Sequence, residues 1–206
     1  MNHYLNSSEP DTKMRIFLTA AELFAKEGYD RVPIRQICEK VGVGKPTLYY
    51  YFKDKETLLT ELVQYSFTLA ENFIKKYMES QDNYFDKLRG IIHARKAFMQ
   101  KYPYFMRFFI MLHLQPIPKT VFNELGKIAH IHFNKLIIFL KEGQQKGFID
   151  RQMNILLLAN TITGTLNQLF FRYALLKDKQ AMSESNLNDL FEFWKNYLFE
   201  NSNELR

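Results

Sequence analysis

A glycine between two short segments of helical periodicity, within Ile34–Glu56, constrains the fold of this chain more than any other feature. The first segment is apolar on one face at helical spacing, through Ile34, Ile37, Cys38 and Val41. Gly42 ends that segment, because glycine adopts the left-handed conformation of a helix C-terminus without steric cost. Pro46 suits the first turn of a second helix, and Leu48 and Phe52 share one face of it. Two short helices joined by a glycine turn form a helix-turn-helix, the motif that places its second helix in the DNA major groove.

Positive charge concentrates at this motif. The chain carries a formal net charge of +6, and residues 31–55 hold six of the cations against two anions. Clustered cations are what contact with DNA phosphates requires. A solvated basic helix face is the alternative, and the motif favours DNA.

A longer pattern surrounds the motif. Its pieces are Ala20-Ala21, Phe24, Gly28-Tyr29, Gly42-Val43, Thr47-Leu48-Tyr49 and Phe52-Lys53-Asp54-Lys55-Glu56. With these residues at fixed spacing, residues 12–63 resemble the tetracycline-repressor (TetR) family of bacterial regulators. Two positions depart from the family pattern: Val32-Pro33 stands where Ser or Thr is usual, and Gly44 replaces the usual Ser.

The resemblance implies an all-α fold of about nine helices. Residues 1–54 would form a three-helix DNA-binding head, and residues 55–206 a helical body for ligand binding and dimerisation. It also implies a homodimeric repressor that leaves a palindromic operator in double-stranded DNA when a hydrophobic small-molecule effector binds. By family position Tyr49 and Lys55 would hold phosphate. The other expected DNA contacts are Pro46 and the candidates for base edges, Arg35, Lys45, Thr47 and Tyr50, among which Lys45 is the best reader of guanine.

Composition fits a cytoplasmic helical protein. Eight glycines and six prolines in 206 residues favour helices over a turn-rich β fold. The single cysteine, Cys38, suits a reducing compartment. Residues 1–10 lack the features of a signal peptide. Gln152–Phe171 is uncharged, but it holds too many amide and hydroxyl side chains for a membrane span.

The body provides candidates for a ligand pocket and for a dimer interface. Aromatic and methionine side chains crowd residues 98–115, and an uncharged helix over 151–176 carries amides and a hydroxyl on one face. Apolar walls with a few polar groups are typical of small-molecule sites. The candidate lining residues are Phe98, Tyr102, Phe105, Phe109, His113, Asn160, Thr163 and Asn167. The alternative is that these residues only build the core.

The last helix, expected over 186–199, carries an apolar stripe. It would form a dimer interface with the 151–176 helix through Leu187, Leu190, Phe191 and Trp194. The alternative is that the stripe packs on its own domain.

No pattern for catalysis, metal or cofactor is found. His130 and His132 point to different sides of a helix, and one cysteine excludes a cysteine-based zinc site. Neither a nucleophile motif nor a glycine-rich phosphate loop occurs. The alternatives to a ligand-responsive repressor are a DNA-binding architectural or division-linked protein without a ligand, and, as a weaker reading, a helical-bundle enzyme.

Overall fold

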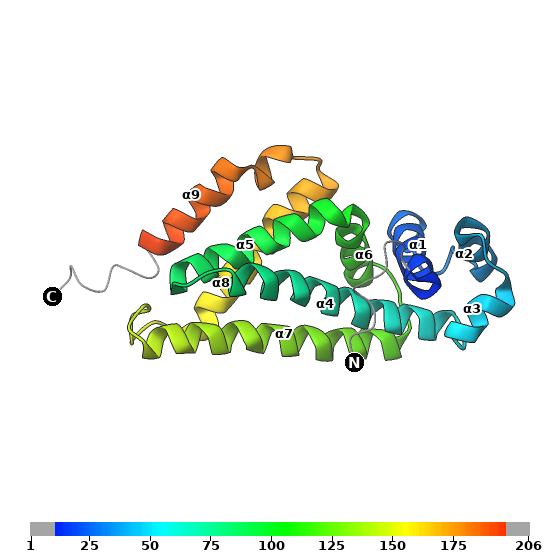
Figure 1. The fold of residues 1–206 in the computed structure, drawn as a ribbon, viewed down its shortest axis with the longest axis horizontal. Helices are drawn as coiled ribbons and strands as arrows, with labels where there is room; N and C mark the ends of the chain where they lie inside the picture. The colour runs from blue at the N-terminus through cyan, green and yellow to red at the C-terminus, as the bar shows by residue number, and fades with distance from the viewer. Residues whose placement is uncertain (1–10, 197–206) are drawn as a thin grey trace. The chain divides into compact units, whose positions relative to one another are not determined.

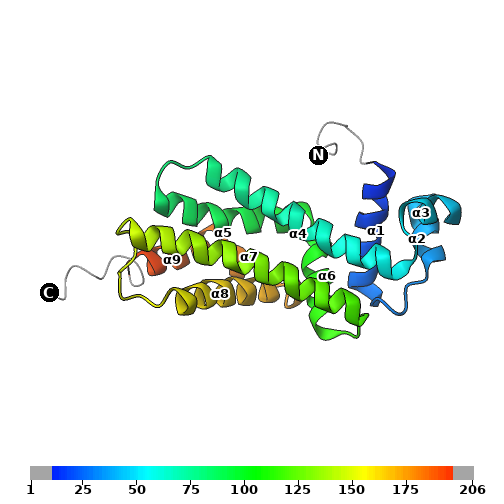
Figure 2. The same ribbon diagram turned by 90° about the horizontal axis from the view of Figure 1, so that it is seen from below.

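The computed structural model describes residues 11–196, and every regular element in this part of the chain is helical, which confirms the all-α expectation. Contacts divide it into two compact units. Unit 1 holds the described residues up to Phe67 together with Tyr104–Leu125, and unit 2 holds Thr68–Pro103 and the described residues from Gly126 on. Helices α4 (Lys55–Glu79) and α7 (Lys119–Gln145) each begin in unit 1 and end in unit 2 (Figure 2). The predicted boundary between residues 54 and 55 does not coincide with the division into these compact units, and it stays a prediction.

Unit 1 begins with three helices that lead into α4 (Figure 1): α1 (Thr12–Glu27), α2 (Ile34–Val41) and α3 (Lys45–Tyr51). Its core is made by the apolar face of each helix, for example Ile16, Phe17, Phe24, Ile37, Leu48, Phe52, Leu58 and Leu62. The rings of Phe17 and Phe52 lie 5.2 Å apart, so α1 packs against the end of α3.

The first half of α4 is also tied to α6 (Pro103–Leu114) and to the start of α7. The rings of Phe67 and Phe109 meet edge to face at 5.3 Å. Gln64 Nε2 donates to Glu124 Oε1 at 3.0 Å, and the Thr120 hydroxyl donates to Glu56. These contacts join the helix that follows the DNA motif to two helices that come much later in the chain.

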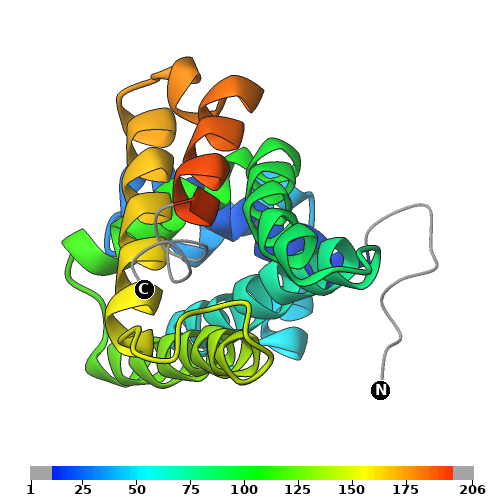
Figure 3. The same ribbon diagram turned by 90° about the vertical axis from the view of Figure 1, so that its left-hand side faces the viewer.

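Unit 2 contains α5 (Tyr84–Lys101), α8 (Ile155–Leu175), the short 3-10 helix η1 (Lys179–Met182) and α9 (Glu184–Trp194). Figure 3 shows η1 at the turn between α8 and α9. Ion pairs link α5 to α9: Arg89 Nη2 lies 3.0 Å from Glu192 Oε1, and Lys96 pairs with Glu184.

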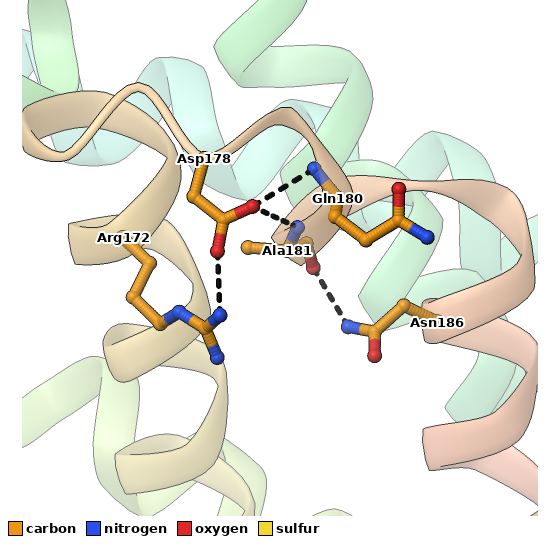
Figure 4. Close-up of polar contacts among 5 residues, drawn as sticks. All are labelled: Arg172, Asp178, Gln180, Ala181 and Asn186. Atoms are coloured by element: carbon orange, nitrogen blue, oxygen red, sulfur yellow. Dashed lines mark hydrogen bonds and ion pairs between the residues drawn. The ribbon is translucent and has the colours of Figure 1, made fainter.

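One carboxylate organises the corner between α8 and α9 (Figure 4). Asp178 accepts hydrogen bonds from the Gln180 and Ala181 N–H groups, at 3.0 and 3.3 Å, and from Arg172 Nη2 at 2.5 Å. Asn186 Nδ2 then donates to the Ala181 carbonyl at 2.9 Å, which ties α9 to the same corner.

Capping side chains explain where these helices begin. The helix predicted to start at Arg151 starts at Ile155, because the Asn154 side chain accepts from the Leu157 N–H. The last helix starts at Glu184 because Ser183 caps it in the same way. Its predicted end at Phe199 lies outside the described residues. None of the helices described is long and apolar enough to cross a membrane.

Candidate nucleic-acid interface

The turn between α2 and α3 has the geometry that its glycine predicts. Gly42 adopts φ 78° and ψ 37°, in the left-handed region. The N–H groups of Gly42 and Val43 both donate to the Cys38 carbonyl, at 2.9 and 3.0 Å, and this closes α2. Burial raises the pKa of the Cys38 thiol, so this side chain stays protonated and packs as a small apolar group.

Helix α3 has one face buried in the core of unit 1, and its remaining faces are exposed to solvent. Leu48 and Phe52 are 0% exposed. On the remaining faces Tyr49 is 49% and Tyr50 83% exposed. Lys45, Pro46 and Thr47 are exposed as well. All five residues predicted on α3 to contact DNA are therefore at the surface.

The cationic side chains around α3 differ in whether they already form hydrogen bonds or ion pairs within the protein. Among the described residues, Lys45 and Lys53 have neither a hydrogen bond nor an ion pair from their side chains, and both are exposed. Arg35 is exposed but pairs with Glu39 on the next turn of α2, with Nε 2.6 Å from Oε1. Lys45 and Lys53 are the cations most available to phosphates or bases.

Lys55, predicted to hold phosphate, is engaged inside the head. Its Nζ donates to the carbonyls of Tyr29 and Asp30, at 2.5 and 3.4 Å, and lies 4.2 Å from the centre of the Tyr29 ring. Burial lowers the pKa of Lys55, and the charge of Asp30 opposes this shift. A phosphate at Lys55 would have to share an ammonium group that already fastens the α1–α2 connection, and that role stays a prediction.

The N-terminus of α4 is capped by a carboxylate of the protein itself. Asp54 Oδ1 accepts from the Thr57 N–H at 2.7 Å, and these hydrogen bonds lower the pKa of Asp54. Pro33 and Gly44, which precede α2 and α3, make no side-chain cap, as their departures from the family pattern predict.

One residue that shapes this surface was not found from the sequence. Arg15 on α1 donates through Nη2 to the Val41 carbonyl at 2.5 Å and so fixes the C-terminal end of α2. The two residues are 26 positions apart, and no local pattern indicates their contact.

The eight residues predicted to line a ligand pocket fall into both compact units. In unit 1, Phe105 is buried, and the exposed His113 ring bonds through Nδ1 to the Phe109 carbonyl of its own helix at 2.7 Å. In unit 2, the ring centres of Phe98 and Tyr102 lie 5.6 and 6.1 Å from that of Phe73 on α4.

The polar members of that set lie on α8. The Asn160 amide donates to the Leu156 carbonyl within the helix, and Thr163 is half-buried. Asn167 accepts from Arg95 on α5 at 3.3 Å. A pocket shared by all eight residues stays a prediction.

The dimer interface predicted through α9 stays a prediction, but the single chain already covers most of these side chains. Leu187, Phe191 and Trp194 are at most 3% exposed and Leu190 is half-buried, so the stripe packs within unit 2. Arg89 of α5 covers it, with its guanidinium carbon 4.4 Å from the centre of the Phe191 ring. The exposed apolar side chains of α8 and α9 are others, chiefly Leu156, Leu157, Leu175 and Phe193.

Comparison with known proteins agrees with this geometry. The sequence model described as "Bacterial regulatory proteins, tetR family" matches residues 16–62, which include α2 and α3. The fatty acid metabolism regulator protein of Bacillus subtilis is 24% identical over 155 residues, covering 75% of this chain and 79% of that protein. An HTH-type transcriptional regulator of Staphylococcus aureus is 31% identical over 74 residues, 36% of this chain and 38% of that protein.

Solved structures extend the likeness in fold beyond the head. The fatty acid degradation regulator FadR of Bacillus halodurans superposes with a TM-score of 0.78 at 20% identity, over 89% of this chain and 98% of that one. FadR of Bacillus subtilis, in complex with stearoyl-CoA, gives 0.75 at 22% identity, over 87% and 96%. Residues 16–62 therefore carry the DNA-binding helix-turn-helix of TetR-family transcriptional regulators, and the chain shares its fold with the solved FadR structures.

Proposed function

We propose that this regulator is a repressor: as a homodimer it binds a palindromic operator through α3, and a hydrophobic small molecule releases it. The observation that carries the proposal is the outer face of α3, where two exposed tyrosines and the unpaired Lys45 stand above two fully buried anchors. A twofold dimer presents two such helices, and successive major grooves on one side of a duplex recur at about 34–36 Å. The protein acts in the cytoplasm as a binding protein, without catalysis or a cofactor.

A fatty acyl compound is the effector that the relatives favour. The Bacillus subtilis FadR structure contains stearoyl-CoA, and a second relative is named for fatty acid metabolism. The aromatic cluster of Phe73, Phe98 and Tyr102 supplies apolar surface of the kind that an acyl chain would contact.

Helix α4 supports a route for release. Three residues separate it from the end of α3. Its first half is tied to α6 and α7 in unit 1, and its second half carries Phe73 in unit 2. An effector releases DNA only if it binds one spacing of the two heads better than another. A ligand that displaces α4 would change that spacing.

The DNA half of the proposal is tested by selecting duplexes from a random pool with the full chain. We expect a palindrome. Because Lys45 has no competing partner, Lys45→Ala should change the selected bases and cost about 1–3 kcal/mol on the wild-type site. Lys75→Ala removes the same charge from a surface pair with Glu79 in unit 2 and serves as the control. An unchanged site and affinity for Lys45→Ala would remove Lys45 from the interface.

The effector half is tested on the operator complex. Stearoyl-CoA, stearate and unrelated hydrophobic compounds are titrated while fluorescence anisotropy of the duplex is followed. We expect the acyl compounds to lower the anisotropy. A complex that survives all of them would favour an architectural or division-linked DNA-binding protein without a ligand.

A further inference from the structure

An arginine inside unit 2 lacks a carboxylate partner. Arg95, on α5, donates through Nη1 to the amide oxygen of Asn167 on α8 at 3.3 Å. Its guanidinium carbon lies 5.6 Å from the centre of the Phe170 ring. Among the described residues no Asp or Glu lies within ion-pair distance of it. Its two partners, an amide and an aromatic ring, leave its charge uncompensated.

The contrast with another cation of the same helix is sharp. Arg89 combines a salt bridge to Glu192 with an aromatic ring, Phe191. Arg95 has the ring without the salt bridge, and burial lowers its pKa to about 10. Part of the Arg95 side chain is nevertheless accessible to solvent. Its hydrogen-bond partner Asn167 is exposed, so an anion from solution can reach both side chains.

The charged groups near Arg95 are already committed to each other. Glu71 of α4 pairs with Lys135 of α7, and the ring of His132 lies 3.8 Å from the same carboxylate. Desolvation lowers the pKa of His132, the Glu71 charge opposes this, and the charges of Lys135 and Arg95 add to it. Cations therefore outnumber carboxylates here. Retaining a desolvated, unpaired cation costs free energy, and binding sites are where proteins commonly retain one.

Apolar side chains accompany this charge. Phe98 follows Arg95 by three residues and so lies on the same side of α5. Its ring packs edge to face on Phe73 at 5.6 Å. The Phe170 ring lies beside the guanidinium itself, and positive charge next to apolar surface suits a long apolar group that ends in negative charge.

We propose that Arg95 and Asn167 bind the anionic oxygens of an amphiphilic effector, a carboxylate or a phosphate, whose apolar chain contacts Phe73, Phe98 and Phe170. Arg95 supplies charge and N–H donors, and the Asn167 amide orients the guanidinium and can donate to the same anion. The inference rests on the proposed function and adds the charge of the effector and the group that recognises it.

Direct binding to the DNA-free protein tests this, with dodecanoate, lauroyl-CoA and the neutral dodecanol followed by calorimetry. Wild type should bind dodecanoate about 10- to 100-fold more tightly than dodecanol, and Arg95→Gln should abolish that preference while it still binds the alcohol. Arg89→Gln removes the same charge from the same helix and should retain the preference. In another outcome, wild type prefers only lauroyl-CoA over dodecanol and binds dodecanoate no better than the alcohol. If Arg95→Gln abolishes that preference, the anion that Arg95 binds is a phosphate.

The ligand-free variant adds a second measurement. Because the unpaired cation is costly in the empty protein, Arg95→Gln should unfold at the same or a higher temperature than wild type. A variant that has lost its helical circular dichroism would give Arg95 a structural role and overturn the proposal, as would an unchanged preference in a folded variant. Equal binding of dodecanol, dodecanoate and lauroyl-CoA by wild type would overturn this inference alone. Wild type that binds none of the three compounds would overturn it together with the acyl effector.

Discussion

Gly42 and Gly44 lie two residues apart, but only Gly42 has a backbone conformation that favours glycine. Gly42 has a positive φ of 78° and no neighbouring atom within 4 Å of an added Cβ, so any penalty for alanine there is conformational. Gly44 has an ordinary φ of −74° and only lacks a capping side chain.

We expect Gly42→Ala to lower the free energy of unfolding by about 1–2 kcal/mol. Gly44→Ser should raise it by a few tenths of a kcal/mol, because serine caps α3. Chemical denaturation of both variants measures the difference. Equal effects would mean that the turn relaxes into another conformation.

Single residues whose role depends on their neighbours in sequence can be predicted, and those whose partners are distant in sequence cannot. Gly42, Leu48 and Phe52 have roles set by their immediate neighbours, so spacing alone predicted them. Lys55 does not: its ammonium group binds carbonyls of residues 29 and 30, and only the folded chain brings these together. Arg95 is the same case, since its meeting with Asn167 spans 72 positions.

At the level of helices, periodicity located α8 and α9, and caps decided their first residues, whereas η1 between them was not predicted. Periodicity could not decide which protein surface an apolar stripe covers. The stripe on α9 fits a dimer interface and a domain core equally well, and in the single chain it is buried with Arg89 of α5 over it.

The corner between α8 and α9 is expected to weaken in acid. The hydrogen bond from Arg172, with those from the Ala181 and Gln180 N–H groups, lowers the pKa of Asp178 in the folded protein. A lowered folded pKa gives stability that is fully present above the unfolded value of about 3.9 and is lost as the pH falls through the folded value. Asp178→Asn should therefore melt below wild type at pH 7, and the gap between the two melting temperatures should close as the pH is lowered well below that unfolded value. A gap that persists there would show that the charge of Asp178 is not its cause.

The proposed homodimer would be formed through apolar side chains that one chain leaves exposed. Leu157 of α8 is 64% exposed, and Trp194 of α9 is 1% exposed. If α8 contributes to a twofold interface, Leu157→Asp should give folded monomers, since an aspartate in the first turn of a helix is well tolerated.

Trp194→Ala should instead destabilise each subunit by about 3–5 kcal/mol. Analytical ultracentrifugation combined with thermal melts separates the two effects. A Leu157→Asp protein that sediments as wild type does would place the interface elsewhere.

The position of Lys55 has a consequence for lysine acylation. Its lowered pKa makes the amine more nucleophilic at neutral pH, but its two carbonyl partners and the Tyr29 ring shield it. Lys45 and Lys53 are open to any acetyl donor, and losing their charge would weaken DNA binding in a folded protein. Acetylation of Lys55 requires the head to open first, and the modified side chain cannot restore its charged hydrogen bonds. Mass spectrometry of acetylated lysines would thus record DNA occupancy at two positions and head opening at the third.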